Sequence, residues 1–166
     1  YYKKNSFNLT VDPNGGTWRG NSTQTTFSVS DGSSQVIEDP IAPVGGSVKL
    51  HYHDDDGRVV TQQVRKKFSN WSKTGGGTFE SSTKKFTSGN GDAKLKANYT
   101  NGTITLPRLE REHYTFIGWD TTPDLDPDVE NPDYLPGQTI TVNNNMELHA
   151  IWKVDFELEA YIERVL

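Results

Sequence analysis

Residues 146–152 read Met146-Glu147-Leu148-His149-Ala150-Ile151-Trp152, with Met, Leu, Ala and Trp at alternate positions. Alternation with a period of two is typical of a β-strand that buries one face. The same pattern recurs at 7–11, 48–52, 60–68, 95–99 and 104–106, whereas the helical spacing hardly appears. The sequence therefore predicts a mainly β fold with short helices or none.

Turn-forming residues separate these runs. The stretches 12–16 (Asp-Pro-Asn-Gly-Gly) and 54–57 (Asp-Asp-Asp-Gly) predict tight turns, because Asn and Gly tolerate positive φ. The Gly- and Ser-rich stretches 28–46 and 71–90 are expected to be long connections. Helix is the alternative at 109–113 and at 156–166, although the second stretch also alternates like a strand.

Composition excludes several classes of protein. The chain has 166 residues, a formal net charge of −5 and no cysteine, so disulfides, thiolate metal sites and nucleic-acid binding are not expected. No apolar run is long enough to span a membrane. Aliphatic residues are few, but 4 Trp, 7 Tyr and 7 Phe can build small cores. Because the sequence opens without Met or a signal-like stretch, we expect a mature or excised fragment.

Two motifs occur twice in the same order. Phe68-Ser-Asn-Trp71 matches Phe116-Ile-Gly-Trp119, and the alternating stretch 95–99 (Leu-Lys-Ala-Asn-Tyr) matches 148–152 (Leu-His-Ala-Ile-Trp). The second copy is longer, and its extra residues are most simply placed in the acidic loop 120–136. This internal repeat assigns Trp71, Trp119 and Trp152 to module cores.

The repeated motifs, with 14–18 (Asn-Gly-Gly-Thr-Trp) as an opening, resemble the Listeria/Bacteroides repeat, or internalin-type B-repeat, of bacterial surface proteins. The resemblance is best over 103–153; Asn70 replaces a preferred Gly, and Tyr99 replaces the closing Trp. It implies tandem β-grasp-like modules on the cell surface or cell wall. Such modules act without catalysis as a stalk, spacer or adhesive surface.

The motifs predict a division into four parts. These are an N-terminal β segment at 1–46, a degenerate module at 47–100, a second module at 101–153 and a tail at 154–166. Residues 1–100 forming one interleaved unit is the alternative. Tandem modules of this kind contact mainly their neighbours in the chain.

Trp18 and Tyr134 are the candidate ligand-binding residues. Trp18 follows a Gly-Gly turn and belongs to no alternating apolar pattern, so it is the tryptophan best suited to an exposed contact, although packing within a hairpin is the favoured interpretation. Tyr134 lies beside the acidic loop. Both could stack on sugar rings, so a carbohydrate-binding module attached to a glycan-degrading enzyme is the alternative function.

Two stretches have residues suited to metal ions. Asp124, Asp126, Asp128 and Glu130 could wrap Ca²⁺ weakly, but the calcium-loop pattern is absent and a solvated acidic loop is the default. His51 and His53 would share one face of a strand, as in a metal-dependent hydrolase, but a third ligand would have to come from the fold. A solvated strand face is the favoured interpretation there.

The sequence has no phosphate-binding loop, nucleophile elbow or other spacing that assembles a catalytic group. Together with the resemblance to B-repeats, which implies an extracellular module of a bacterial surface protein, this leads us to predict a non-catalytic protein with no cofactor beyond weak Ca²⁺. The expected partners are neighbouring repeats and a host or matrix protein or glycan.

Overall fold

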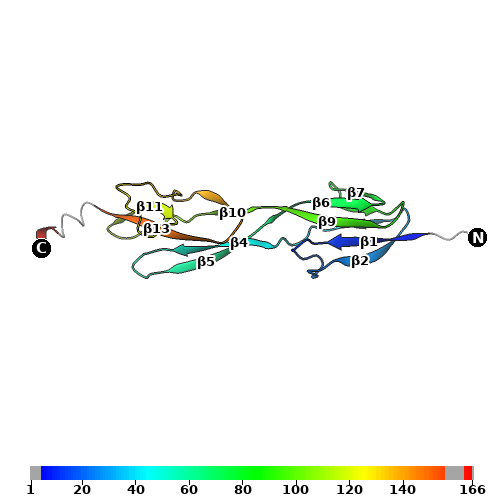
Figure 1. Ribbon diagram of the computed structural model, residues 1–166, viewed down its shortest axis with the longest axis horizontal. Helices are drawn as coiled ribbons and strands as arrows, with labels where there is room; N and C mark the ends of the chain where they lie inside the picture. Colours follow the sequence, from blue (N-terminus) through cyan, green and yellow to red (C-terminus); the bar gives the residue numbers. More distant parts are fainter. Residues whose placement is uncertain (1–4, 156–162, 166) are drawn as a thin grey trace, which may run out of the picture. The chain divides into compact units, whose positions relative to one another are not determined.

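The computed structural model describes residues 5–155 and 163–165 (Figure 1). It is mainly β, with 55% of residues in strands and 2% in helix, which confirms the predicted class. The strands of the described residues are β1 (Ser6–Asp12), β2 (Thr25–Ser30), β3 (Ser34–Val36), β4 (Val44–His51), β5 (Val59–Arg65), β6 (Lys67–Gly75), β7 (Thr78–Glu80), β8 (Lys85–Thr87), β9 (Ala93–Thr100), β10 (Gly102–Thr105), β11 (Tyr114–Asp120), β12 (Thr139–Val142) and β13 (Met146–Val154).

The chain forms two compact units, and each is assembled from two separate stretches. Unit 1 takes Tyr1–Pro43 and Arg65–Thr100, and unit 2 takes Val44–Val64 and Asn101–Leu166. The division after residue 100 coincides with a predicted boundary, and the one after 43 lies close to the predicted boundary at 46. The return of the chain to unit 1 after residue 64 has no counterpart among the predicted boundaries. The reason is that β4 pairs with β13, which follows residue 100, and β5 lies beside β4 in the same sheet. No local pattern reveals such long-range pairing.

Unit 1 contains a four-stranded sheet in the order β2-β1-β9-β6. The central pair β1·β9 is parallel, and both outer pairs are antiparallel. A second sheet, β3-β8-β7, forms within stretches predicted as long connections, 28–46 and 71–90. Aromatic and aliphatic side chains fill the core, among them Leu9, Val11, Trp18, Ile37, Trp71, Phe86 and Leu95.

Unit 2 contains a four-stranded sheet in the order β5-β4-β13-β11 and a two-stranded sheet, β10-β12. Here too the central pair, β4·β13, is parallel, and β11 pairs antiparallel with β13. Its core includes Val48, Leu50, Leu106, Trp119, Val142 and Leu148.

The repeated motifs lie at equivalent places in the two sheets. Phe68 pairs with Tyr99 and, after a β-bulge, Trp71 pairs with Ala97. In unit 2, Phe116 pairs with Trp152 and, after a bulge, Trp119 pairs with Ala150. The two sheets therefore share strand order, register and bulge.

Three local predictions were wrong or incomplete. The alternating run 60–68 is divided between β5 and β6, because the chain passes from one unit to the other there. Residues 109–113 form no helix; a bridge between Arg111 and Tyr114 begins β11 instead. The tail 156–166 lies mostly outside the described residues, of which 163–165 are helical.

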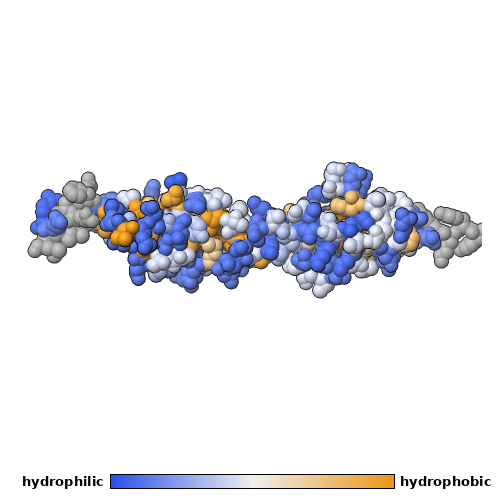
Figure 2. Space-filling model, turned by 45° about the horizontal axis from the view of Figure 1, so that its top comes forward, coloured by the Kyte–Doolittle hydropathy of each residue, from blue (hydrophilic) through white to orange (hydrophobic). Residues whose placement is uncertain are grey.

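The visible surface in Figure 2 is largely hydrophilic, with smaller apolar patches. Among the described residues, the exposed large hydrophobic side chains include Val129, which is 77% exposed, and Leu135, which is 61% exposed. Within the described residues, no helix is long and apolar enough to span a membrane.

Candidate metal centre

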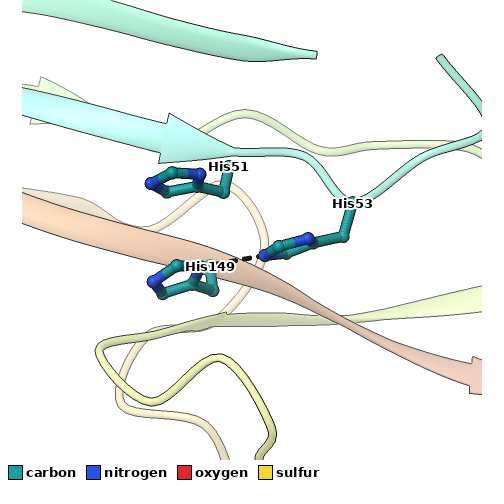
Figure 3. Close-up of side chains that lie close together, drawn as sticks. All are labelled: His51, His53 and His149. Atoms are coloured by element: carbon teal, nitrogen blue, oxygen red, sulfur yellow. Dashed lines mark hydrogen bonds between the residues drawn. The ribbon is translucent and has the colours of Figure 1, made fainter. Parts of the chain in front are cut away.

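Three histidines of unit 2, one on β4, one on β13 and one in the turn after β4, lie together at one end of the β4·β13 pair (Figure 3). His51 is the last residue of β4 and pairs with His149 of β13. His53 follows two residues after His51. Among the described residues, this is the only group of three or more His, Cys, Asp or Glu whose ligand atoms lie close enough to hold one ion, all within 4.8 Å of one another.

The turn after β4 brings His53 back toward the sheet. His53 has a φ of 50°, and the Asp54 carboxylate accepts hydrogen bonds from the backbone N–H and the guanidinium of Arg58, which closes the turn. Asn14, which follows β1 in unit 1, has a similar φ of 46°. The left-handed conformation therefore belongs to this turn in both units and is not special to the histidine.

The three imidazole rings form a stack. The ring centroids of His51 and His149 are 4.4 Å apart with an interplanar angle of 14°, and those of His53 and His149 are 5.1 Å apart at 18°. His53 Nε2 and His149 Nδ1 share a hydrogen bond of 2.8 Å, which requires one of the two nitrogens to be an unprotonated acceptor. His51 Nε2 donates to the Glu147 carboxylate.

Burial is the main reason that the pKa of His149 is lowered, and the neighbouring His51 and His53 lower it further. Glu147 and Asp124 act in the opposite direction. The pKa of the Glu147 carboxyl is lowered, chiefly by its hydrogen bond with His51. The site thus favours neutral imidazole at His149, the form that binds metals.

The carboxylates predicted to bind Ca²⁺ do not converge in the structure. Asp124, Asp126, Asp128 and Glu130 are all exposed in the loop between β11 and β12. Asp128 forms an ion pair of 3.0 Å with Lys153, and Asp126 accepts the backbone N–H of Asp128. Weak Ca²⁺ binding by this loop stays a prediction.

Trp18 is the predicted site residue that the structure places most differently. It is 1% exposed, Phe27 stacks on its ring, and its Nε1 donates to the Glu38 carbonyl. Its rings therefore offer no open face for a sugar, and packing within unit 1 is its observed role. Tyr134 is half-buried and packs against the unit 2 core, where its backbone pairs with Trp119.

The tryptophans assigned to module cores lie there. Trp119 is fully buried and Trp71 is 9% exposed, while Trp152 is partly buried against the unit 2 core. Trp119 Nε1 donates to the Pro107 carbonyl, whereas Trp71 Nε1 has no hydrogen-bond partner in the described part of the chain.

Sequence reasoning missed His149 and Glu147 as members of the histidine group. They lie almost one hundred residues from His51 along the chain, and only the parallel pairing of β4 with β13 brings them to it. No local motif signals this pairing.

Comparisons with protein-family models, with curated proteins and with solved structures gave no match.

Proposed function

We propose that the chain is a non-catalytic, extracellular module of a bacterial surface protein that acts as a stalk or spacer and presents an interaction surface. The observation that carries this proposal is the parallel central strand pair found in both units, β1·β9 and β4·β13. Within the described residues, each pair joins the first strand of its unit in chain order to the last.

Parallel pairing places these two chain ends at opposite ends of the strand pair. In unit 1, Leu9 lies beside Ala93 and Asp12 beside Lys96, so tension between the start of β1 and the end of β9 shears the pair. The backbone hydrogen bonds then carry the load together. A hairpin pulled at its open end would instead lose its hydrogen bonds one at a time.

Unit 2 has the same mechanical arrangement. Met146 lies beside Val48 and His149 beside His51, while β4 begins at Val44 and β13 ends at Val154. The chain also passes between the units three times, after 43, 64 and 100. A cysteine-free chain has no disulfides to resist tension, so sheared strand pairs supply that resistance.

The matching sheets support a tandem, β-grasp-like architecture. Both have a parallel central pair, and in both the last strand of that pair is joined on its other side by an antiparallel strand. The Phe and Trp residues on either side of the bulge also have the same register in both sheets. Units built alike and joined in series suit a spacer whose neighbours are further units of the same kind.

Single-molecule force spectroscopy tests the proposal, and the absence of native cysteine allows defined pulling points. Tethers at Asn5→Cys and Asp155→Cys load both parallel pairs in shear, and we expect high unfolding forces. Tethers at Ser6→Cys and Ser30→Cys, which face each other at the open end of β1·β2, unzip the sheet and should give markedly lower forces. Equal forces from the two geometries would refute the spacer role.

One observation favours glycan binding as a second candidate function. Unit 1 has a hollow of about 240 Å³ lined by Phe68, Trp71 and Phe79 together with Asp39, Ser69, Asn70, Ser81 and Lys84. Aromatic and polar groups that converge in a hollow suit a sugar ring. Trp71, with its unpartnered Nε1, lies in this lining.

A binding screen against immobilised glycans and extracellular-matrix proteins tests this second candidate. A glycan hit weakened by Phe79→Ala, but not by Trp18→Phe in the buried core, would support the hollow as the site. Binding that Phe79→Ala leaves unchanged would exclude the hollow.

A further inference from the structure

We propose that unit 2 binds a divalent transition-metal ion, Zn²⁺ being the best fit, through His51, His53 and His149. The proposal concerns unit 2 by itself and does not depend on the spacer role. Three imidazole nitrogens suit Zn²⁺ and its neighbours Cu²⁺ and Ni²⁺, whereas Ca²⁺ and Mg²⁺ require oxygen ligands.

Comparison of the two units shows that the fold does not require histidine at these positions. Matching the registers of β1·β9 and β4·β13 places Asp12 of unit 1 at the position of His51, Asn14 at that of His53 and Lys96 at that of His149. The aromatic residues that end the repeated motif, Tyr99 and Trp152, confirm the alignment because they bond to equivalent carbonyls. The Tyr99 hydroxyl donates to the Pro13 carbonyl, and Trp152 Nε1 donates to the Tyr52 carbonyl.

Glu147, which lies beside the histidine cluster, also has a chemically different counterpart in unit 1. Lys94 of unit 1 corresponds to Glu147 of unit 2, and Lys94 forms an ion pair of 3.7 Å with Asp12. Unit 1 therefore has an ordinary ion pair where unit 2 has a carboxylate hydrogen-bonded to an imidazole. The same backbone accommodates the residues of unit 1 or those of unit 2 at these positions. Folding therefore does not explain why three histidines lie together in unit 2.

The donor atoms are nearly in place. A tetrahedral Zn²⁺ ion with bonds of about 2.0–2.1 Å holds its ligand nitrogens about 3.4 Å apart. His53 Nε2 and His149 Nδ1 are 2.8 Å apart, and the ligand atoms of all three residues lie within 4.8 Å of one another. The χ2 torsion of histidine is broad, so these rings, which are not fully buried, have freedom to rotate toward a shared ion.

Glu147 supplies the contact that usually accompanies a metal-binding histidine. Its carboxylate accepts from His51 Nε2, which leaves His51 Nδ1 as the metal-binding nitrogen. Three protein ligands leave one coordination position for water or an external ligand.

The ion would join strands β4 and β13, whose histidines are far apart in sequence, and so would stabilise unit 2. A ligand that binds the folded state stabilises it by an amount that grows with ligand concentration. We therefore expect a rise in the melting temperature of unit 2 with added Zn²⁺, and no comparable rise with Ca²⁺.

Isothermal titration calorimetry with ZnCl₂, on protein without a histidine tag, measures the binding. We expect one Zn²⁺ per chain. His149→Gln should weaken binding at least tenfold, and Glu147→Gln should weaken it by about 10- to 100-fold, as is usual for such supporting carboxylates. His113→Gln is the matched control, because His113 is an exposed histidine of unit 2 outside the cluster.

A variant that carries the residues of unit 1 at these positions of unit 2, the transplanted variant, distinguishes loss of the metal ligands from loss of folding. The combination His51→Asp, His53→Asn, His149→Lys and Glu147→Lys gives unit 2 the residues that unit 1 already has at these positions. We expect this variant to fold, as judged by circular dichroism, and to bind no Zn²⁺. Absence of 1:1 binding by the parent chain, or Zn²⁺ binding unchanged in the folded transplanted variant, would overturn the proposal.

Discussion

At the scale of single residues, two indole nitrogens at equivalent positions have different environments. Trp119 Nε1 donates to the Pro107 carbonyl, whereas Trp71 Nε1 is buried without a partner in the described residues. Both rings are core residues that come directly after the bulge of their strand. A buried donor without an acceptor costs about 1–3 kcal/mol, so the same substitution should have different effects in the two units.

We predict that Trp119→Phe destabilises unit 2 by about 1 kcal/mol more than Trp71→Phe destabilises unit 1, because only the first change removes a hydrogen bond. Urea unfolding followed by circular dichroism measures both. Trp119→Ala should cost about 3–5 kcal/mol, as expected for a deleted core aromatic. An unchanged unfolding midpoint for Trp119→Ala would show that Trp119 is not a core residue.

Tyr99 makes the stability of unit 1 sensitive to alkaline pH. Burial raises the pKa of its hydroxyl, and Asp12 raises it further. A pKa that is higher in the folded state gives stability that is present below the unfolded value and is lost as the pH rises through the folded value. Only the protonated hydroxyl can donate to the Pro13 carbonyl.

We therefore predict that unit 1 loses stability from about pH 10 upward, the ordinary range of tyrosine ionisation. Urea midpoints measured between about pH 9 and 11 should fall in the parent chain and fall less in Tyr99→Phe. Tyr114→Phe, in unit 2, is the control and should leave the pH dependence of unit 1 unchanged. The same slope in Tyr99→Phe and the parent would contradict the assignment.

At the scale of elements, the bulge in β11 depends on glycine, whereas the bulge in β6 does not. Gly118 has a φ of 152°, and a Cβ there would lie 2.2 Å from the Tyr134 carbonyl oxygen. The backbones of Trp119 and Tyr134 exchange two hydrogen bonds at this point. The equivalent residue of β6 is Asn70, which is exposed.

We predict that Gly118→Ala destabilises unit 2 by about 2–4 kcal/mol, through backbone strain and the clash with residue 134. Asn70→Ala, the matched change in unit 1, should cost about 1 kcal/mol or less, since it removes only an exposed hydrogen bond to Asn98. Chemical denaturation of the two variants tests the comparison. Equal costs would show that the approach of Tyr134 does not constrain β11.

At the scale of the whole molecule, the interleaved chain makes each half dependent on the other. Residues 101–166 contain β13 but not β4, its parallel partner. The missing stretch also supplies Val48, Leu50 and Val64 to the core of unit 2. The second module predicted from sequence, 101–153, therefore lacks half of its central strand pair.

We predict that the isolated fragment 101–166 does not fold cooperatively. Joining residues 44–64 to it through a Gly/Ser linker should restore a folded unit 2. Amide chemical-shift dispersion in NMR spectra distinguishes folded from unfolded fragments. A well-dispersed spectrum from 101–166 without 44–64 would show that the segment is dispensable.

Local sequence was sufficient for the strands and for most of the core. Alternation located the strand segments at 7–11, 95–99 and 146–152, and the repeated motifs located Trp71 and Trp119 in the cores. It left Trp18 open between an exposed contact and packing within a hairpin, because burial of that ring depends on Phe27 and Glu38, which lie in other parts of unit 1. It also failed to show that the stretches 28–46 and 71–90 contain the strands of a second sheet.

The sequence by itself determined the β class and the positions of the aromatic motifs, because alternation and spacing act over a few residues. The tertiary structure alone decided which strands pair, and therefore how the two units interleave and where His149 and Glu147 meet His51 and His53. The physical reason is that parallel pairing joins strands through long connections, whose outcome depends on the packing of the whole unit.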